Sequence, residues 1–186
     1  MNFFVSSRGS ATANGKLGGL TGADQLCQTL ATDVGQGTKT WRAYLSVANP
    51  TAINARDRIG EGPYYNSRGA MVAATKAALH AATGDAALFL DERGNRINGQ
   101  WSGSPSPNQH DVYTGSDRAG MLAGADMTCT DWTSTTGMTQ VGHTDGTGPN
   151  GNTSGNYAYW SGSHQSSCND PTPAGGAGKI YCFVGP

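Results

Sequence analysis

The side chains best suited to chemistry are aromatic rings set among small polar residues in the second half of the chain. Trp132, Tyr157, Tyr159 and Trp160 lie in or beside long segments rich in Gly, Ser, Thr and Asn. A flat ring can stack on a sugar, and neighbouring polar groups supply directional hydrogen bonds. This combination is typical of a site for a hydroxyl-rich ligand such as a glycan. The candidate ligand-binding residues are Asp117, Arg118, His143, Asp145, Asn150, Asn152, Asn156, Tyr157, Tyr159, Trp160 and His164.

A second interpretation stays open for the rings, because a tryptophan near a cysteine can pack as core over a disulfide. We favour the core for Trp132, which lies close to Cys129 in the sequence. For Tyr157 and Tyr159, alternation along a predicted strand points both rings to one face, and that face can be core or surface.

Motifs for catalysis are missing from the sequence. It contains no Gly-x-Ser-x-Gly, no His-Glu-x-x-His and no phosphate-binding glycine loop followed by lysine, so we expect no enzymatic activity. A lone histidine in a polar loop is more often solvated than a ligand, which we expect for the scattered residues His80, His110, His143 and His164.

Metal and cofactor binding are not expected either. His143 and Asp145 would form half of a metal site, but no third ligand stands at a readable spacing. Carboxylates at Asp117, Asp145 and Asp170 would suit calcium, yet they lack the spacing of an EF-hand. We therefore interpret these side chains as solvated, with no metal site and no cofactor.

Composition places the chain among loop-rich domains. Of its 186 residues 28 are glycine, whereas charged residues supply only 13%, which argues against a coiled coil or a helical bundle. A net charge of −1 offers no basic stripe for nucleic acid and no attraction to a membrane surface. No apolar run reaches the length of a membrane span. We expect one domain over residues 1–186, and the polar start without a basic leader suggests a mature fragment or module of a larger protein.

Four widely separated cysteines, Cys27, Cys129, Cys168 and Cys182, do not match the close ligand pairs of a zinc ribbon. Two disulfides are the favoured interpretation, with four buried free thiols as the alternative. Disulfides persist in oxidising compartments, so we expect an extracellular or cell-surface protein. The sequence alone allows three pairings.

Hydrophobic periodicity predicts one clear helix, which begins with Thr21 as N-cap and stops at Gly35. Its apolar face comprises Ala23, Leu26, Cys27, Leu30 and Ala31, so Cys27 points inward. Strands are predicted over 3–5, 41–46, 87–90, 112–114, 157–160 and 180–184, and a short helical turn over 50–60. Residues 70–82 have helix propensity without a clean apolar stripe, and a helix there is left open.

Several motifs in one order resemble the collagen-derived endostatin domain and related bacterial surface proteins. They are Gly18-Gly19-Leu20-Thr21-Gly22-Ala23-Asp24-Gln25-Leu26-Cys27, Trp41-Arg42-Ala43-Tyr44-Leu45-Ser46, Tyr113-Thr114-Gly115-Ser116-Asp117, Cys129-Thr130-Asp131-Trp132, Trp160-Ser161-Gly162, Ser167-Cys168 and Tyr181-Cys182-Phe183-Val184. The resemblance implies an α+β, C-type-lectin-like fold with two helices flanking small antiparallel sheets, long loops and termini close together. It also implies the nested pairing Cys27–Cys182 and Cys129–Cys168.

The family's metal-binding residues do not carry over to this sequence. Calcium-dependent sugar binding in C-type lectins uses Glu-Pro-Asn or Gln-Pro-Asp and a later Trp-Asn-Asp, whereas this chain has Ser106-Pro107-Asn108 and Trp160-Ser161-Gly162. Endostatin's zinc site uses an N-terminal histidine cluster, and the first histidine here is His80. The resemblance therefore implies neither a calcium nor a zinc site.

These observations favour a non-enzymatic extracellular recognition or adhesion module, of the kind found in bacterial surface adhesins. Its ligand would be a glycan or another cell-surface group, bound by loops between about Ser116 and Asp170. The alternative is a structural or assembly module at the end of a surface fibre. Its partners would be further copies of the same chain, in a homo-oligomer such as a trimer. Neither nucleic acid nor membrane insertion is expected.

Overall fold

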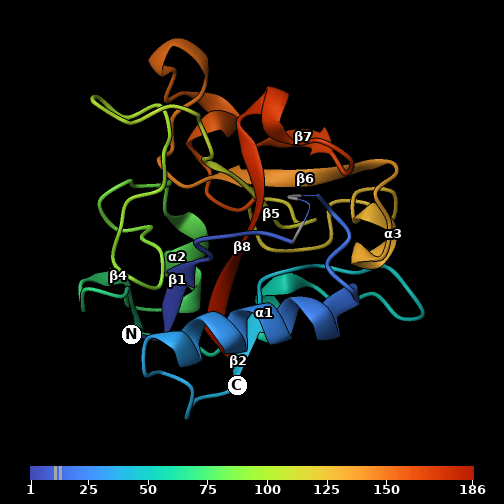
Figure 1. Ribbon diagram of the computed structural model, residues 1–186, viewed down its shortest axis with the longest axis horizontal. Coiled ribbons are helices and arrows are strands. Elements are labelled where there is room, and N and C mark those ends of the chain that lie inside the picture. Colours follow the sequence, from blue (N-terminus) through green and yellow to red (C-terminus); the bar gives the residue numbers. More distant parts are fainter. Residues whose placement is uncertain (11, 13) are drawn as a thin grey trace.

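The computed structural model describes residues 1–10, 12 and 14–186, and it has the mixed α+β architecture expected from the sequence. Short helices and strands are joined by long loops, as the glycine content indicates (Figure 1). The elements are β1 Phe3–Val5, α1 Gly19–Asp33, β2 Trp41–Ala43, η1 Ala55–Arg58, β3 Tyr64–Tyr65, β4 Met71–Ala73, α2 Lys76–Ala81, β5 Asp111–Tyr113, α3 Cys129–Trp132, β6 Met138–His143, η2 Pro149–Gly151, η3 Gly155–Ala158, β7 His164–Ser167, η4 Thr172–Ala174 and β8 Gly176–Val184.

Strand β8 organises the main sheet, whose order is β1-β8-β5-β6-β7 with β2 also paired to β8. β1 and β2 both pair antiparallel with the second half of β8, so that Phe4 and Ala43 are each in register with Cys182. β5 pairs with the first half of β8 in parallel. The two chain ends therefore lie close together, at the end of the molecule where α1 crosses (Figure 1).

Helix α1 begins two residues before the predicted N-cap. Gly18 takes the cap position in the left-handed conformation, with φ of 81°, and no side chain caps the helix. The predicted cap Thr21 is instead an exposed residue within the helix. Glycine adopts positive φ without steric cost, which is why the chain can turn into the helix here rather than at Thr21. The helix ends at Asp33, and Gly35 follows with φ of 74°, as predicted for its stop.

The apolar face of α1 packs on the sheet as its periodicity predicts. Ala23, Cys27, Leu30 and Ala31 are buried, whereas Leu26 is only half-buried at the margin of that face. Cys27 forms a disulfide with Cys182 on β8, with the Cα atoms 5.5 Å apart. This bond ties α1 to the central strand.

The second disulfide joins Cys129 to Cys168, so both pairs implied by the family resemblance are present. Cys129 opens α3, a single turn in which all four residues have φ between 51° and 67°. A left-handed conformation costs roughly 1–2 kcal/mol per residue without glycine. The disulfide and the fully buried Trp132, whose indole donates to the Ser46 carbonyl at 2.8 Å, offset that cost.

Two clusters of buried side chains lie on either side of the sheet's central strand. One lies beneath α1 and contains both disulfides. The other is largely aromatic, with Trp160 fully buried among Tyr44, Phe89, Tyr181 and Phe183 at ring-centroid distances of 4.8–6.2 Å. The Trp160 indole and the Tyr181 hydroxyl donate to backbone carbonyls, and the Tyr44 hydroxyl bonds to His80, so aromatic residues with one polar atom can fill a dry core.

Three predicted strands differ from the structure, and the structure decides the segment 70–82, for which the sequence leaves a helix open. The strand over 41–46 ends at Ala43, and residues 70–82 divide into β4 and the short helix α2. The predicted strand over 87–90 is wrong, because Leu88 and Phe89 donate to Asp85 O in a turn. Residues 157–160 are not a strand either, since η3 covers Gly155–Ala158. Short apolar runs in both places are buried by tertiary contact rather than by pairing in a sheet.

The long loops gather at the end of the molecule opposite α1 (Figure 1). They comprise the segment before β5, which bends through residues 98–109, and the segment between β6 and β7. In the part of the chain that the structure describes, no helix has the length and apolar character that crossing a membrane requires.

Candidate functional site

Several of the candidate ligand-binding residues, among them Arg118, Asn156 and Tyr159, lie on one face built by loops whose backbones pack closely. A Cβ atom at Gly142 on β6 would stand only 1.7 Å from the Trp160 carbonyl oxygen. A Cβ at Gly162 would meet the backbone of Asp117 and Arg118 at 2.5 Å. Because only glycine leaves room for these approaches, segments 117–118 and 160–162 can pack side by side against β6.

Arg118 and Tyr159 form a cation–π pair on this face. The Arg118 guanidinium donates to the Tyr159 hydroxyl at 2.9 Å and lies 5.3 Å from the centre of the Tyr159 ring. Arg118 is exposed and Tyr159 half-exposed. The pair presents ring edge and charged donors together, beside an open recess that Asp117, Gln140 and Asn156 also line.

Four recesses succeed one another around this pair, with volumes of 290–420 Å³. The first and second recesses both have Arg118 in their lining, and the second and third both have Asn156. The third and fourth recesses share Tyr157 and His164. We call this surface the grooved face. It is an extended, open surface of mixed polar and apolar character rather than a closed pocket.

Trp160 is not part of this face, and its predicted role in ligand binding is wrong. Its side chain is fully buried and its indole donates to the Leu79 carbonyl at 2.8 Å. The prediction failed because residues 157–160 do not form a strand. η3 turns the chain so that Trp160 enters the aromatic core while Tyr157 and Tyr159 stay half-exposed.

Two predicted carboxylates are occupied by the protein itself. Asp117 Oδ1 accepts the backbone N–H groups of Ala119 and Met121, so this carboxylate shapes its own turn. Asp145 is buried and accepts from His110 Nδ1 at 2.8 Å and from the backbone N–H of Gln100 at 2.6 Å. The interpretation of Asp145 as a solvated acid is therefore wrong, whereas Asp117 is exposed as expected.

The three predicted asparagines are exposed but differ in position. Asn156 lines two adjoining recesses of the grooved face. Asn152 lines one of them, and its Oδ1 accepts from the backbone and hydroxyl of Ser154. Asn150, with φ of 56°, lies in η2 outside the four recesses. Asn156 is therefore the amide best placed for a ligand.

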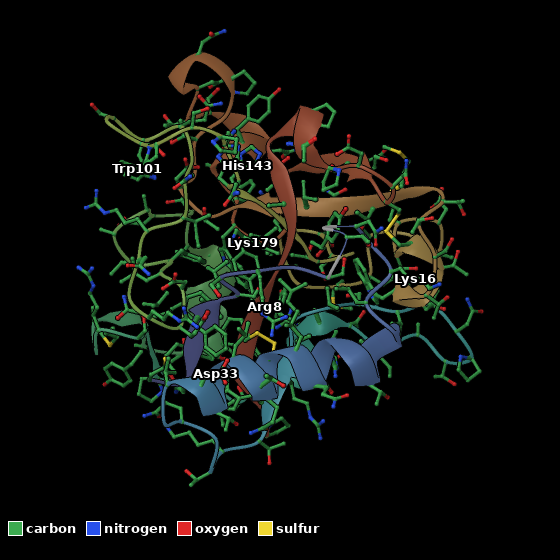
Figure 2. The ribbon with its side chains drawn as sticks, in the orientation of Figure 1. Arg8, Lys16, Asp33, Trp101, His143 and Lys179 are labelled. Carbon is green, nitrogen blue, oxygen red and sulfur yellow. A yellow bond between two sulfur atoms is a disulfide. The ribbon has the colours of Figure 1, made fainter. Side chains whose placement is uncertain are left out.

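Three histidines surround one buried carboxylate beneath the fourth recess, and we call them with Asp111 the histidine–aspartate cluster. The Nε2 atoms of His110 and His143 lie 3.3 and 3.2 Å from Asp111 Oδ1, and His164 Nε2 lies 3.4 Å from Oδ2. His110, His143 and Asp111 are almost fully buried, whereas 30% of the His164 side chain is exposed. Figure 2 shows His143 among the loops at the end opposite α1.

Adjacent strands assemble this cluster. His110 and Asp111 stand at the start of β5, and His143 at the end of β6 is in register with Asp111. His164 begins β7, in register with Val141 on β6. The sheet thus brings four separated side chains to one edge.

The outer nitrogen of each imidazole points to an acceptor. Nδ1 of His110 faces Asp145 Oδ1 at 2.8 Å, and Nδ1 of His143 faces the Tyr157 carbonyl at 3.0 Å. Nδ1 of His164 faces the Gln165 carbonyl at 2.9 Å. Carbonyl and carboxylate oxygens only accept, so a hydrogen on each Nδ1 satisfies these contacts, while each Nε2 faces the carboxylate of Asp111.

The cluster keeps its carboxylates ionised. Burial raises the pKa of Asp111, but the imidazoles of His143 and His164 lower it by more, and the net pKa is below the ordinary value. Burial likewise raises the pKa of Asp145, and His110 together with backbone N–H groups lowers it below its ordinary value. Two negative charges therefore stand beside three imidazoles near neutral pH.

Sequence reasoning missed this cluster because the histidines look scattered along the chain. The expectation that they are solvated is wrong for His110 and His143, which are 2% and 1% exposed. One signal was present, the His110-Asp111 pair at the edge of the predicted strand 112–114. The pairing of three strands supplied the rest, and no local pattern encodes that register.

Comparisons with protein-family models and with curated proteins identify no relative of this chain. No protein-family model matches the chain. A search of curated proteins finds no significant match.

Proposed function

We propose that this chain is a non-enzymatic, extracellular recognition module that binds a glycan or another hydroxyl-rich surface ligand along the grooved face. The observation that carries the proposal is the run of adjoining recesses around Arg118 and Tyr159, whose linings combine polar groups with apolar surface. A run of shallow recesses accommodates an elongated ligand better than a single deep pocket would.

The chemistry of the grooved face supports such a ligand. Tyr159 offers a ring for stacking, Arg118 offers donors, and Asn156 offers both a donor and an acceptor. The low charge of the chain, −1 overall, favours neutral or mixed ligands over polyanions.

Fold and compartment also support the proposal. The α+β architecture, the nested disulfides and the adjacent termini agree with the endostatin-like and C-type-lectin-like resemblance, which we adopt as the proposed family. Two intramolecular disulfides indicate an oxidising, extracellular environment. We infer secretion from this environment.

A glycan array probed with the folded, oxidised domain tests the proposal. We expect binding, and we expect Tyr159→Ala to weaken it by about 10-fold or more, as truncation of an aromatic anchor does. Tyr65→Ala is the matched control, because Tyr65 is 38% exposed on β3 in the separate two-stranded sheet. Its binding should equal that of the unmodified chain.

Two outcomes would contradict this function. One is a blank array and no binding to cell surfaces while the near-ultraviolet circular dichroism shows a folded domain. The other is an oligomer in light scattering whose interface covers Arg118 and Tyr159, which would favour the assembly alternative.

A further inference from the structure

We propose that the histidine–aspartate cluster binds one divalent transition-metal ion of the zinc class, with His110, His143 and Asp111 as ligands and His164 closing the site. The proposal is independent of glycan binding and stands on the geometry of these four side chains.

The directions of the imidazoles are the first argument. Each Nδ1 faces a carbonyl or carboxylate oxygen, and the three Nε2 atoms converge on the carboxylate of Asp111. In neutral rings with the hydrogen on Nδ1, the Nε2 lone pairs face this carboxylate, and a cation between them stabilises the arrangement. A metal ion satisfies all four groups at once, and outer hydrogen bonds of this kind are the usual support of histidine ligands.

The distances are the second argument. Zinc takes nitrogen and oxygen ligands at about 2.0–2.1 Å, and a tetrahedron with such bonds has ligand–ligand edges of about 3.3–3.4 Å. The Nε2 atoms of His143 and His110 lie 3.2 and 3.3 Å from the same oxygen, Asp111 Oδ1, which matches two such edges, whereas His164 Nε2 lies 3.4 Å from the other oxygen, Oδ2. The ligand atoms of His110, Asp111 and His143 all lie within 4.8 Å of one another.

The unpartnered carboxylate is the third argument. Both oxygens of Asp111 are buried, and neither has a hydrogen-bond partner among the described residues. Buried charges are normally paired, hydrogen-bonded or bound to metal, because an isolated one is very costly. The three imidazoles stand 3.2–3.4 Å from the Asp111 oxygens without a well-formed hydrogen bond among the described residues, and a metal ion between the rings and the carboxylate would pair this group.

The donor set and the access route define the class of metal. Three imidazoles and one carboxylate suit zinc and its neighbours, whereas calcium prefers six to eight oxygen ligands. The recess lined by Tyr157, Gln100 and the three histidines opens onto the cluster, and the exposed edge of His164 lies beside it. An ion can therefore enter without unfolding the sheet.

Titration of the chelator-treated, folded chain with Zn²⁺ in a calorimeter tests this site. We expect one ion per chain with a dissociation constant below about 1 µM. Co²⁺ should give the intense visible absorption of a four-coordinate site. His164→Ala should weaken Zn²⁺ binding at least 10-fold, and Asp145→Asn should weaken it by about 10- to 100-fold through the orientation of His110.

His80→Gln is the matched control, because His80 lies outside the cluster and hydrogen-bonds to Tyr44. Its Zn²⁺ affinity should be unchanged. Since Asp111 and His143 are buried and their variants can fail to fold, His164→Ala and nitrogen NMR of the unmodified chain provide a second route. Zn²⁺ should shift the Nε2 signals of His110 and His143.

Either of two results would overturn the proposal. The first is a folded chain that binds no Zn²⁺ and shows protonated Nε2 atoms at pH 7. The second is Zn²⁺ binding that His164→Ala and Asp145→Asn leave unchanged, with no shift of the cluster's Nε2 signals.

Discussion

Replacing Trp160 by phenylalanine separates a core role from a ligand-binding role. The indole is fully buried and packs against Tyr44 and Tyr181 at ring-centroid distances of 4.8 and 5.1 Å. Phenylalanine keeps a ring in this position but loses the indole N–H that donates to the Leu79 carbonyl at 2.8 Å. We therefore expect Trp160→Phe to act on stability rather than on ligand contact.

Two terms set the size of the effect. The smaller side chain leaves a void of about 40 Å³, which costs about 1 kcal/mol at roughly 24 cal/mol per Å³. Loss of the hydrogen bond costs about 1 kcal/mol. The cost is no larger because the Leu79 carbonyl still accepts a hydrogen bond from the Ala82 N–H at 3.2 Å and is not left unpaired. The free energy of unfolding should fall by about 2 kcal/mol, which lowers the melting temperature by about 4–8 °C.

Urea unfolding at 25 °C with both disulfides intact measures this change. The matched control is Trp101→Phe, because Trp101 is partly exposed and its indole also donates to a carbonyl, that of Ile97 at 2.8 Å. The control should cost less than about 1 kcal/mol because its void is open to water. A Trp160→Phe variant as stable as the unmodified chain, or no less stable than Trp101→Phe, would refute the assignment of Trp160 to the core.

Three further predictions concern stability. The double variant Cys129→Ser/Cys168→Ser opens a loop of 39 residues and should lose up to about 4 kcal/mol in urea unfolding; a loss below 1 kcal/mol would contradict it. Burial lowers the pKa of the His80 imidazole in the folded chain below 6.5. As the pH drops below 6.5, the unfolded chain therefore takes up a proton at His80 before the folded chain does, and the free energy of unfolding falls. His80→Gln should flatten that dependence between pH 7 and 5, and an unchanged slope would refute this. Gly142→Ala forces a Cβ to 1.7 Å from a backbone carbonyl and should cost at least about 3 kcal/mol or abolish folding, whereas a fully stable variant would show that this approach is relaxed.

The parts of the fold that could be predicted are those with a local signal. Helix α1 shows helical spacing of Ala23, Cys27 and Leu30, and β8 is a run of apolar residues at the chain end. The disulfide pairs followed from the family resemblance, not from spacing. Residues 87–90 and 157–160 failed because a short apolar run is equally consistent with a buried turn.

The candidate site shows the same division. The sequence located the polar loop region and predicted Arg118 and Asn156 at its surface, since loops rich in small polar residues usually lie there, whereas it left core or surface open for Tyr159. It placed Trp160 wrongly and treated Asp145 as solvated, because burial is set by the packing of distant segments. Close approaches at Gly142 and Gly162 decide which side chains face out.

The sequence by itself determined that this chain forms disulfides, has a helix that packs through Cys27, and places its polar loops in the second half. These properties follow from composition and from spacing along the chain. Only the tertiary structure decided that His110, His143 and His164 meet around Asp111. Their meeting depends on the register of β5, β6 and β7, and strand register is a property of paired chains that no single segment contains.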